Sequence, residues 1–103
     1  MPNSVKVLLV DDNPMVLGLL HGALTALASV TTSSDTADAL LKAVDDPPDL
    51  LVSDYRMPGM DGHQLVERLR SRPKTAGIAV ILLASKADIS EKLSSQEPLD
   101  DFV

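Results

Sequence analysis

Short stretches rich in apolar or β-branched residues recur along the 103-residue chain, and four of them have the composition of strands. They cover residues 5 to 10, 29 to 32, 49 to 54 and 79 to 84. The first, VKVLLV, and the fourth, AVILLA, are apolar at nearly every position, which is typical of parallel strands covered on both faces. The second, SVTT, is predicted to be a strand from its β-branched residues.

Helical periodicity separates these strands, and residues that cap helices mark where each helix begins. The predicted caps are Asn13, which precedes Pro14, then Asp35, and then Asp61, which with Gln64 has the spacing of a capping box. In the first helix the apolar positions are Val16, Leu19, Leu20, Ala23, Leu24 and Leu27. In the second and third helices they are Ala37, Leu40, Leu41 and Val44, and Leu65, Val66 and Leu69.

Strands that alternate with helices through short loops predict an α/β domain with an open, doubly wound parallel sheet. We expect the flavodoxin-like strand order 2-1-3-4-5, with helices on both faces. Asp88 and Glu91 repeat the capping pattern after the fourth strand, and residues 98 to 103, PLDDFV, have the composition of a fifth strand. We expect strand five to be cut short and the last helix to be missing, so that residues 1–103 form a single, C-terminally incomplete domain.

Composition and charge exclude several classes of function. Fifteen acidic residues against nine basic ones give a net charge of -6, the wrong sign for binding a phosphate backbone. With only two aromatic residues, Tyr55 and Phe102, the chain has little with which to stack on bases. The chain has no cysteine, no signal-peptide pattern and no apolar run long enough to cross a membrane. We therefore expect a cytoplasmic protein that binds neither nucleic acid nor membrane directly.

Three aspartates follow strands that should be neighbours in this sheet. Asp11 and Asp12 come directly after the first strand, and Asp54 ends the third. Ligands of doubly wound sheets bind at the carboxyl ends of the strands where the strand order reverses, between strands one and three, so the three carboxylates should converge there. Two of them about 5 Å apart repel by roughly 3 kcal/mol at an effective dielectric of about 20.

A hard divalent cation would relieve this repulsion. Mg²⁺ prefers oxygen ligands and bridges carboxylates to phosphate oxygens, and a carboxylate beside it can act as a nucleophile. Asp54 is the candidate nucleophile, and Asp11 and Asp12 are candidate metal ligands. Taken singly, Asp11 or Asp12 could equally be a helix cap or a solvated loop residue, so the hypothesis depends on the three together.

The segments VLLVDDNP, LLVSDYRMPGMDG and AVILLASKAD together resemble the receiver domain of bacterial two-component response regulators, over the whole chain. The resemblance implies Mg²⁺-dependent transfer of a phosphoryl group from the phosphohistidine of a histidine kinase, or of a phosphotransfer protein, to Asp54. It implies that Asp11 and Asp12 hold Mg²⁺, with Asp12 the more direct ligand, and that Arg56 offers its backbone carbonyl. Arg56 could instead be a solvated loop charge. A phosphorylated receiver domain would be a signalling module rather than an enzyme.

The loop after Asp54 also matches the family. Its matching residues, which we interpret as structural, are Met57, Pro58, Gly59, Asp61 and Gly62. Proline and glycine suit the turn, and Asp61 suits the cap of the third helix. His63 has no partner in this motif, and we expect it to be a surface residue.

The chain departs from the family pattern at the end of strand four. In the family, a threonine or serine at this switch position hydrogen-bonds the phosphoryl group, and here that position is Ala84. Ser85 follows it, so the hydroxyl comes one residue late unless the strand is bulged or slipped. Lys86 lies two residues past the switch position and is either a partial replacement for a missing cation or a solvated lysine.

A second departure lies at the C-terminus. The family's lysine at the end of strand five has no counterpart in this chain, which ends at Val103. Without a final helix, apolar surface and a sheet edge would be exposed, so we expect self-association.

Two other functions stay open from the sequence. One is a receiver-like docking module that works without phosphorylation, which both departures favour and the intact acidic trio disfavours. The other is a metal-dependent phosphatase with an aspartyl nucleophile. That class requires two aspartates separated by one residue after the first strand, whereas Asp11 and Asp12 are adjacent.

Overall fold

The computed structural model describes residues 5–57 and 59–83, and in them strands alternate with helices. In chain order the elements are β1 (Val5–Val10), α1 (Pro14–Leu24), β2 (Ala28–Ser33), α2 (Thr36–Asp45), β3 (Leu50–Asp54), α3 (Gly62–Arg70) and β4 (Ala79–Leu83). β1 has the bounds that the sequence predicts, and β2 and β3 differ from the prediction by one residue at their ends. The predicted fifth strand and the helix predicted after Asp88 lie outside the described residues.

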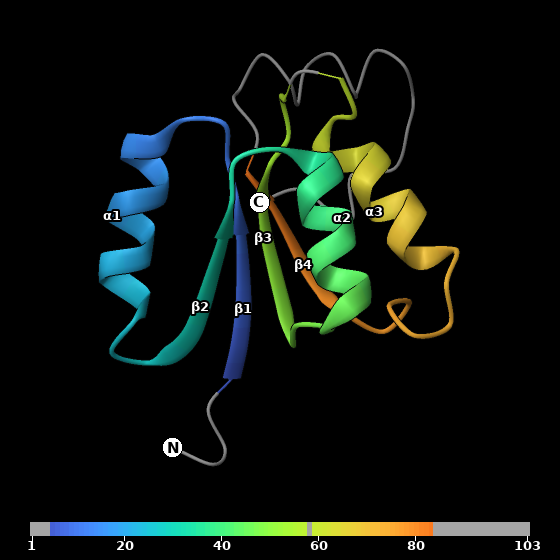
Figure 1. The fold of residues 1–103 in the computed structure, drawn as a ribbon, viewed down its shortest axis with the longest axis horizontal. Helices are drawn as coiled ribbons and strands as arrows, with labels where there is room; N and C mark the ends of the chain where they lie inside the picture. The colour runs from blue at the N-terminus through green and yellow to red at the C-terminus, as the bar shows by residue number, and fades with distance from the viewer. Residues whose placement is uncertain (1–4, 58, 84–103) are drawn as a thin grey trace.

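The four strands form one parallel sheet in the order β2-β1-β3-β4 (Figure 1). β1 lies between β2 and β3, with Val10 opposite Ser33 on one side and Ser53 on the other. The order confirms the flavodoxin-like prediction for these four strands. Chain order reverses at β1, so the carboxyl ends of β1 and β3 form the expected binding position of the fold.

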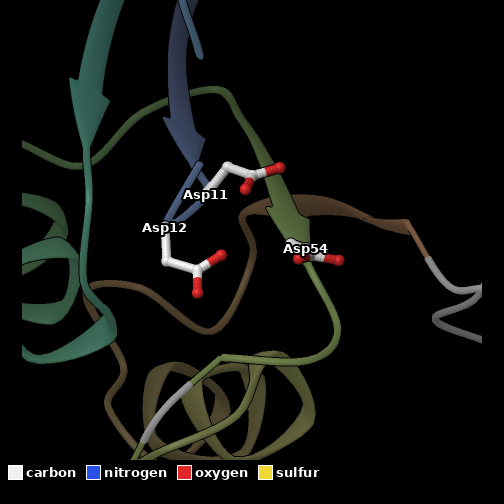
Figure 2. Close-up of side chains that lie close together, drawn as sticks. All are labelled: Asp11, Asp12 and Asp54. Carbon is white, nitrogen blue, oxygen red and sulfur yellow. The ribbon is translucent and has the colours of Figure 1, made fainter. Parts of the chain in front are cut away.

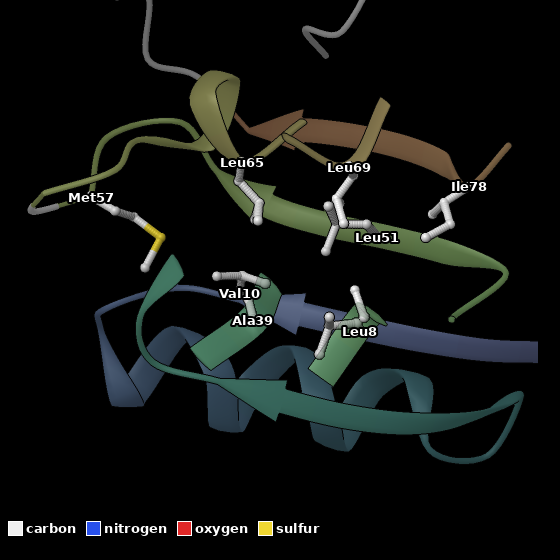
Figure 3. Packing of buried hydrophobic residues seen from close by; sticks show 9 residues of the cluster. Leu8, Val10, Ala39, Leu51, Met57, Leu65, Leu69 and Ile78 are labelled. Carbon is white, nitrogen blue, oxygen red and sulfur yellow. The ribbon is translucent and has the colours of Figure 1, made fainter. Parts of the chain in front are cut away.

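Helices cover both faces of the sheet, with α1 on one side and α2 and α3 on the other (Figure 1). The larger core cluster lies between the sheet and α2 and α3 (Figure 3). Its buried members are Leu8, Val10, Ala39, Ala43, Leu51, Met57, Leu65, Leu69 and Ile78. On the opposite face, Leu17 of α1 packs with Val7 and Leu9 of β1. Apolar residues that alternate along β1 therefore bury both faces of the strand.

The sequence prediction of the buried face of α1 is partly wrong. Leu19 is 70% exposed and Leu27, beyond the end of the helix, is 79% exposed, whereas Leu17, which the periodicity did not select, is buried. Leu17, Leu20 and Leu24 form the stripe that packs on the sheet. The error has a physical cause, because α1 carries apolar residues around most of its circumference and periodicity alone cannot tell which of them face the sheet.

A similar correction applies to α2, while α3 matches the prediction. Ala39 and Ala43 are the residues of α2 with fully buried side chains, whereas Leu41 is 71% exposed and Ala37 is also exposed. Small residues on the buried face let α2 lie close to the sheet. In α3 the predicted apolar residues Leu65, Val66 and Leu69 are all buried.

The three predicted helix caps are confirmed. The Asn13 side chain accepts hydrogen bonds from the first turn of α1, and the Asp35 carboxylate accepts one from the backbone amide of Asp38 at 2.7 Å. Asp61 and Gln64 form a reciprocal capping box at 2.8 and 2.9 Å. These caps satisfy backbone amides that the helices leave unpaired. They also fix the residue at which each loop after β1, β2 and β3 ends and the next helix begins.

Candidate metal centre

Three carboxylates from two neighbouring strands lie together at the carboxyl end of the sheet. Asp11 and Asp12 follow the end of β1, and Asp54 is the last residue of β3 (Figure 2). One carboxylate oxygen from each residue lies within 4.8 Å of the others. The structure therefore brings together the three side chains that the strand order predicts to converge.

Asp11 is held from both sides. Its side chain is buried, its backbone amide donates to the carbonyl of Ser33 at 3.1 Å, and its Oδ1 accepts from the backbone amide of Asn13 at 2.9 Å. Asn13 in turn caps α1, so the turn between β1 and α1 orients Asp11 through its backbone and through one carboxylate oxygen. Asp12 is exposed and lies nearer the solvent side of the cluster.

The environment of Asp54 disfavours its charged form. Partial burial raises the pKa of the Asp54 carboxyl above its usual range, and the charges of Asp11 and Asp12 raise it further. Hydrogen bonding from the backbone amides of Tyr55 and Arg56 acts in the opposite direction. Electrostatic repulsion is therefore concentrated around Asp54, and a bound cation would relieve it.

The donor set fits a hard divalent cation. All three groups offer carboxylate oxygens, which Mg²⁺ prefers over nitrogen or sulfur ligands. At 4.8 Å and an effective dielectric of about 20, each charged pair repels by roughly 3 kcal/mol, and by roughly 1 kcal/mol in bulk water. The oxygen spacing and the raised pKa of Asp54 both favour a cation held between the strands.

The loop from β3 to α3 returns closely to the strand from which it comes. The backbone amide of Gly62 donates to the carbonyl of Tyr55 at 2.9 Å. A Cβ on Gly62 would lie 2.5 Å from the backbone oxygen of Asp54, so only glycine allows this approach. Gly59 has φ 77°, a left-handed conformation that also favours glycine. Met57 is buried in the larger core cluster, as a structural role for this residue requires (Figure 3).

Arg56 and His63 lie at the margins of this loop. Arg56 is exposed, and its backbone amide hydrogen-bonds to the Asp54 carboxylate. The role expected for its backbone carbonyl stays a prediction. His63 lies in the first turn of α3, and its Nδ1 lies 3.1 Å from Oε1 of Glu67, with 24% of its side chain exposed. It is thus half-buried beside an acidic partner rather than a fully exposed surface residue.

The sequence predictions for the switch position fall outside the described residues. Ala84, Ser85 and Lys86 lie there, as do the residues on which the expected self-association depends, so these stay predictions. Pro58 in the loop also lies outside the described residues.

Thr36 contacts the loop that follows Asp54, and the sequence did not indicate this residue. It opens α2, it is 3% exposed, and its hydroxyl donates to the backbone carbonyl of Met60 at 2.5 Å. The contact joins segments 24 residues apart, so neither periodicity nor capping rules could find it.

The family model of the response regulator receiver domain matches residues 7–99. This chain belongs to the response regulator receiver family. Receiver domains are signalling modules, and the acidic pocket in which the family binds Mg²⁺ corresponds here to the cluster of Asp11, Asp12 and Asp54. None of the described helices is long and apolar enough to cross a membrane.

Individual relatives share this region of similarity. The response regulator PleD of Caulobacter vibrioides is 33% identical over 110 residues, which cover 97% of this chain and 24% of PleD. The sensor histidine kinase TmoS of Ectopseudomonas mendocina is 38% identical over 88 residues, which cover 85% of this chain and 9% of TmoS. The chain thus spans less than a quarter of the length of these curated relatives.

Solved receiver structures have the same fold. The chemotaxis protein CheY4 of Vibrio cholerae superposes with a TM-score of 0.74 at 25% identity, over 97% of this chain and 85% of CheY4.

Proposed function

We propose that this chain is a phosphoacceptor receiver domain, in which Asp54 takes a phosphoryl group from the phosphohistidine of a sensor histidine kinase or a phosphotransfer protein. The observation that carries the proposal is the convergence of three carboxylate oxygens within 4.8 Å at the ends of β1 and β3. Family membership and the relatives that are themselves sensor histidine kinases support the choice of partner. Phosphorylation then changes the affinity of the domain for its partners in the cytoplasm.

Each residue of the cluster has a role in this proposal. A carboxylate oxygen of Asp54 attacks phosphorus, the bond from phosphorus to the histidine nitrogen breaks with its electron pair on nitrogen, and an acyl phosphate forms. Asp11, Asp12, Asp54 and the backbone carbonyl of Arg56 would hold Mg²⁺. When bound, Mg²⁺ would offset part of the negative charge of the carboxylates and of the phosphoryl oxygens. The turn after β1 fixes one carboxylate oxygen of Asp11, and the close approach of Gly62 constrains the backbone of Asp54, before the donor arrives.

The alternative of a phosphorylation-independent docking module is not favoured. Such a module gives no use to three carboxylates that repel one another and that surround a partly buried Asp54 with a raised pKa.

The test is modification of the intact protein by acetyl phosphate with Mg²⁺, followed by mass spectrometry. We expect one phosphoryl group on Asp54, none in Asp54→Asn, and strong reduction in Asp12→Asn. Asp45→Asn is the matched control, because Asp45 is an exposed aspartate on α2. An unmodified Asp54, or modification that persists in Asp54→Asn, would overturn the proposal.

The switch position adds a prediction that rests on sequence alone. Because Ala84 has no hydroxyl to bond a phosphoryl group, phosphorylation should persist while its effect on partner binding is weakened. Ala84→Thr should strengthen phosphorylation-dependent partner binding, measured as the ratio of partner affinities with and without acetyl phosphate. No gain in Ala84→Thr, together with a loss in Ser85→Ala, would assign the switch role to Ser85 instead.

A further inference from the structure

The connection between β2 and α2 contacts both chain segments that carry the carboxylate cluster. The backbone carbonyl of Ser33, at the end of β2, accepts from the amide of Asp11 at 3.1 Å. Three residues later, the hydroxyl of Thr36 donates to the backbone carbonyl of Met60 at 2.5 Å, in the loop that follows Asp54. One short segment therefore holds the turn after β1 and the loop after β3.

Thr36 is a rigid donor in this contact. Its side chain is β-branched and 3% exposed, and it begins a helix that Asp35 caps and that Ala39 and Ala43 bury against the core. Breaking this contact therefore requires either a different Thr36 rotamer or movement of α2. The Thr36 bond therefore fixes the Met60 carbonyl relative to the core of the domain, and not only relative to the rest of the loop.

The loop that Thr36 contacts is held at several points between Asp54 and α3. Its base is closed by Gly62 on Tyr55 at 2.9 Å, and its first half is held by the buried side chain of Met57. The Thr36 bond holds its second half. Arg56, whose carbonyl we place on the metal, lies in the same loop between Tyr55 and Met57. Loss of the Thr36 bond removes one of the contacts that hold this loop, so the carbonyl should then be held less firmly.

We propose that Thr36 is a positioning residue for the metal centre, because its hydroxyl holds the loop that connects Asp54 to α3. This inference rests on the proposed function, since it assigns Thr36 to the same Mg²⁺ site. The competing interpretation is that the Thr36 hydroxyl only satisfies a buried carbonyl and contributes to stability alone.

Thr75 offers a matched control for that interpretation. It is also a buried threonine, 0% exposed, and its hydroxyl donates to a backbone carbonyl, that of Leu69, at 2.6 Å. It lies after α3, and Leu69 belongs to the last turns of that helix rather than to the loop after Asp54. Thr75→Val therefore removes a bond of the same type without touching the loop.

The experiment compares Thr36→Val, Thr36→Ser and Thr75→Val with the wild type in calorimetric titrations with Mg²⁺ alone. Loss of one neutral hydrogen bond at a positioning residue should weaken Mg²⁺ binding by about three- to tenfold in Thr36→Val. Thr36→Ser keeps the hydroxyl and should restore most of the affinity. Thr75→Val should unfold at a lower denaturant concentration but bind Mg²⁺ as the wild type does. If Thr36→Val is too unstable to titrate, Thr36→Ala replaces it.

A second measurement needs no metal. In Mg²⁺-free buffer, the loop amides between Tyr55 and Asp61 should exchange hydrogen faster in Thr36→Val than in the wild type or Thr75→Val. Wild-type Mg²⁺ affinity in Thr36→Val, with a stability loss like that of Thr75→Val, would overturn the inference. If the wild type itself binds no Mg²⁺, the proposed function fails, and unchanged loop exchange in Thr36→Val would then overturn the Thr36 role separately.

Discussion

Asp54 links the function of the domain to its stability. The direction of its pKa shift determines whether ionisation of Asp54 stabilises or destabilises the native state. Because burial and two neighbouring aspartates raise that pKa, the native state binds the proton more tightly than the unfolded chain does. Ionisation of Asp54 therefore weakens the native state. The penalty is absent below the unfolded pKa of about 4, grows as pH rises towards the folded pKa, and is complete above it.

We predict that Asp54→Asn is more stable than the wild type at neutral pH without Mg²⁺. The expected gain is about 1 kcal/mol, since solvent screens a partly exposed cluster, and it should shrink towards pH about 4. Urea unfolding at both pH values measures it. An Asn variant that is less stable at pH about 7 would contradict the prediction.

Asp38 supplies a control of opposite sign. Hydrogen bonds from Lys42 and Ser33 lower the pKa of Asp38, so its contribution to stability is present above the unfolded pKa and is lost as pH falls through the folded one. Asp38→Asn should lose a few tenths of a kcal/mol at neutral pH, because solvent reaches both side chains of the pair and screens their attraction. The difference in stability between Asp38→Asn and the wild type should vanish in acid. The opposite difference, the gain in stability of Asp54→Asn, should vanish there as well.

At the scale of elements, α3 begins so close to β3 that its first residue has no room for a side chain. A Cβ on Gly62 would lie 2.5 Å from the Asp54 carbonyl oxygen and 3.1 Å from Cα of Tyr55. We predict that Gly62→Ala loses about 1 to 3 kcal/mol and displaces the end of β3, which reduces phosphorylation of Asp54 as well. Gly77→Ala is the control, because a Cβ there meets nothing within 4 Å. Equal stability of the two variants would argue against this close approach.

Replacing the glycines of α1 with alanine should have the opposite effect on stability. Gly18 and Gly22 lie inside the helix, and an added Cβ at either position meets nothing within 4 Å. Each change to alanine should raise stability by about 0.5 to 1 kcal/mol, because glycine loses more backbone entropy in a helix. Thermal unfolding measures the gain.

Gly59 in the loop after β3 should behave differently. Gly59→Ala should lose about 1 kcal/mol of stability, since a φ of 77° is strained for a residue that has a Cβ.

The elements also show what the sequence could and could not predict. β1 was predicted with its observed bounds because every residue in it except Lys6 is apolar, and the caps Asn13 and Asp61 mark their helices by local chemistry alone. The meeting of Asp11 with Asp54 follows from strand order. The contact of Thr36 with Met60 does not, because it depends on how α2 packs against a loop 24 residues away. The exposed face of α1 was equally hidden, since apolar residues surround that helix.

For the whole molecule, the negative net charge and the carboxylate cluster both favour the binding of a cation. A chain with net charge -6 concentrates three of its acids at one edge of the sheet, so any cation that binds there stabilises the native state and not the unfolded chain. Added salt also screens these charges without binding to them. Binding and screening must therefore be separated before a rise in stability is assigned to the metal.

We predict that MgCl₂ raises the midpoint of thermal unfolding and that NaCl of equal ionic strength does so much less. At a free Mg²⁺ concentration about ten times the dissociation constant, linkage gives a gain of roughly 1.4 kcal/mol. The gain should disappear with a chelator and should be largely lost in Asp12→Asn and Asp54→Asn, which each remove a charged ligand. Asp45→Asn should keep it, because Asp45 lies on α2 away from the cluster. Equal effects of the two salts on the wild type would mean that the carboxylates are screened rather than bridged, and the domain would then have no metal centre.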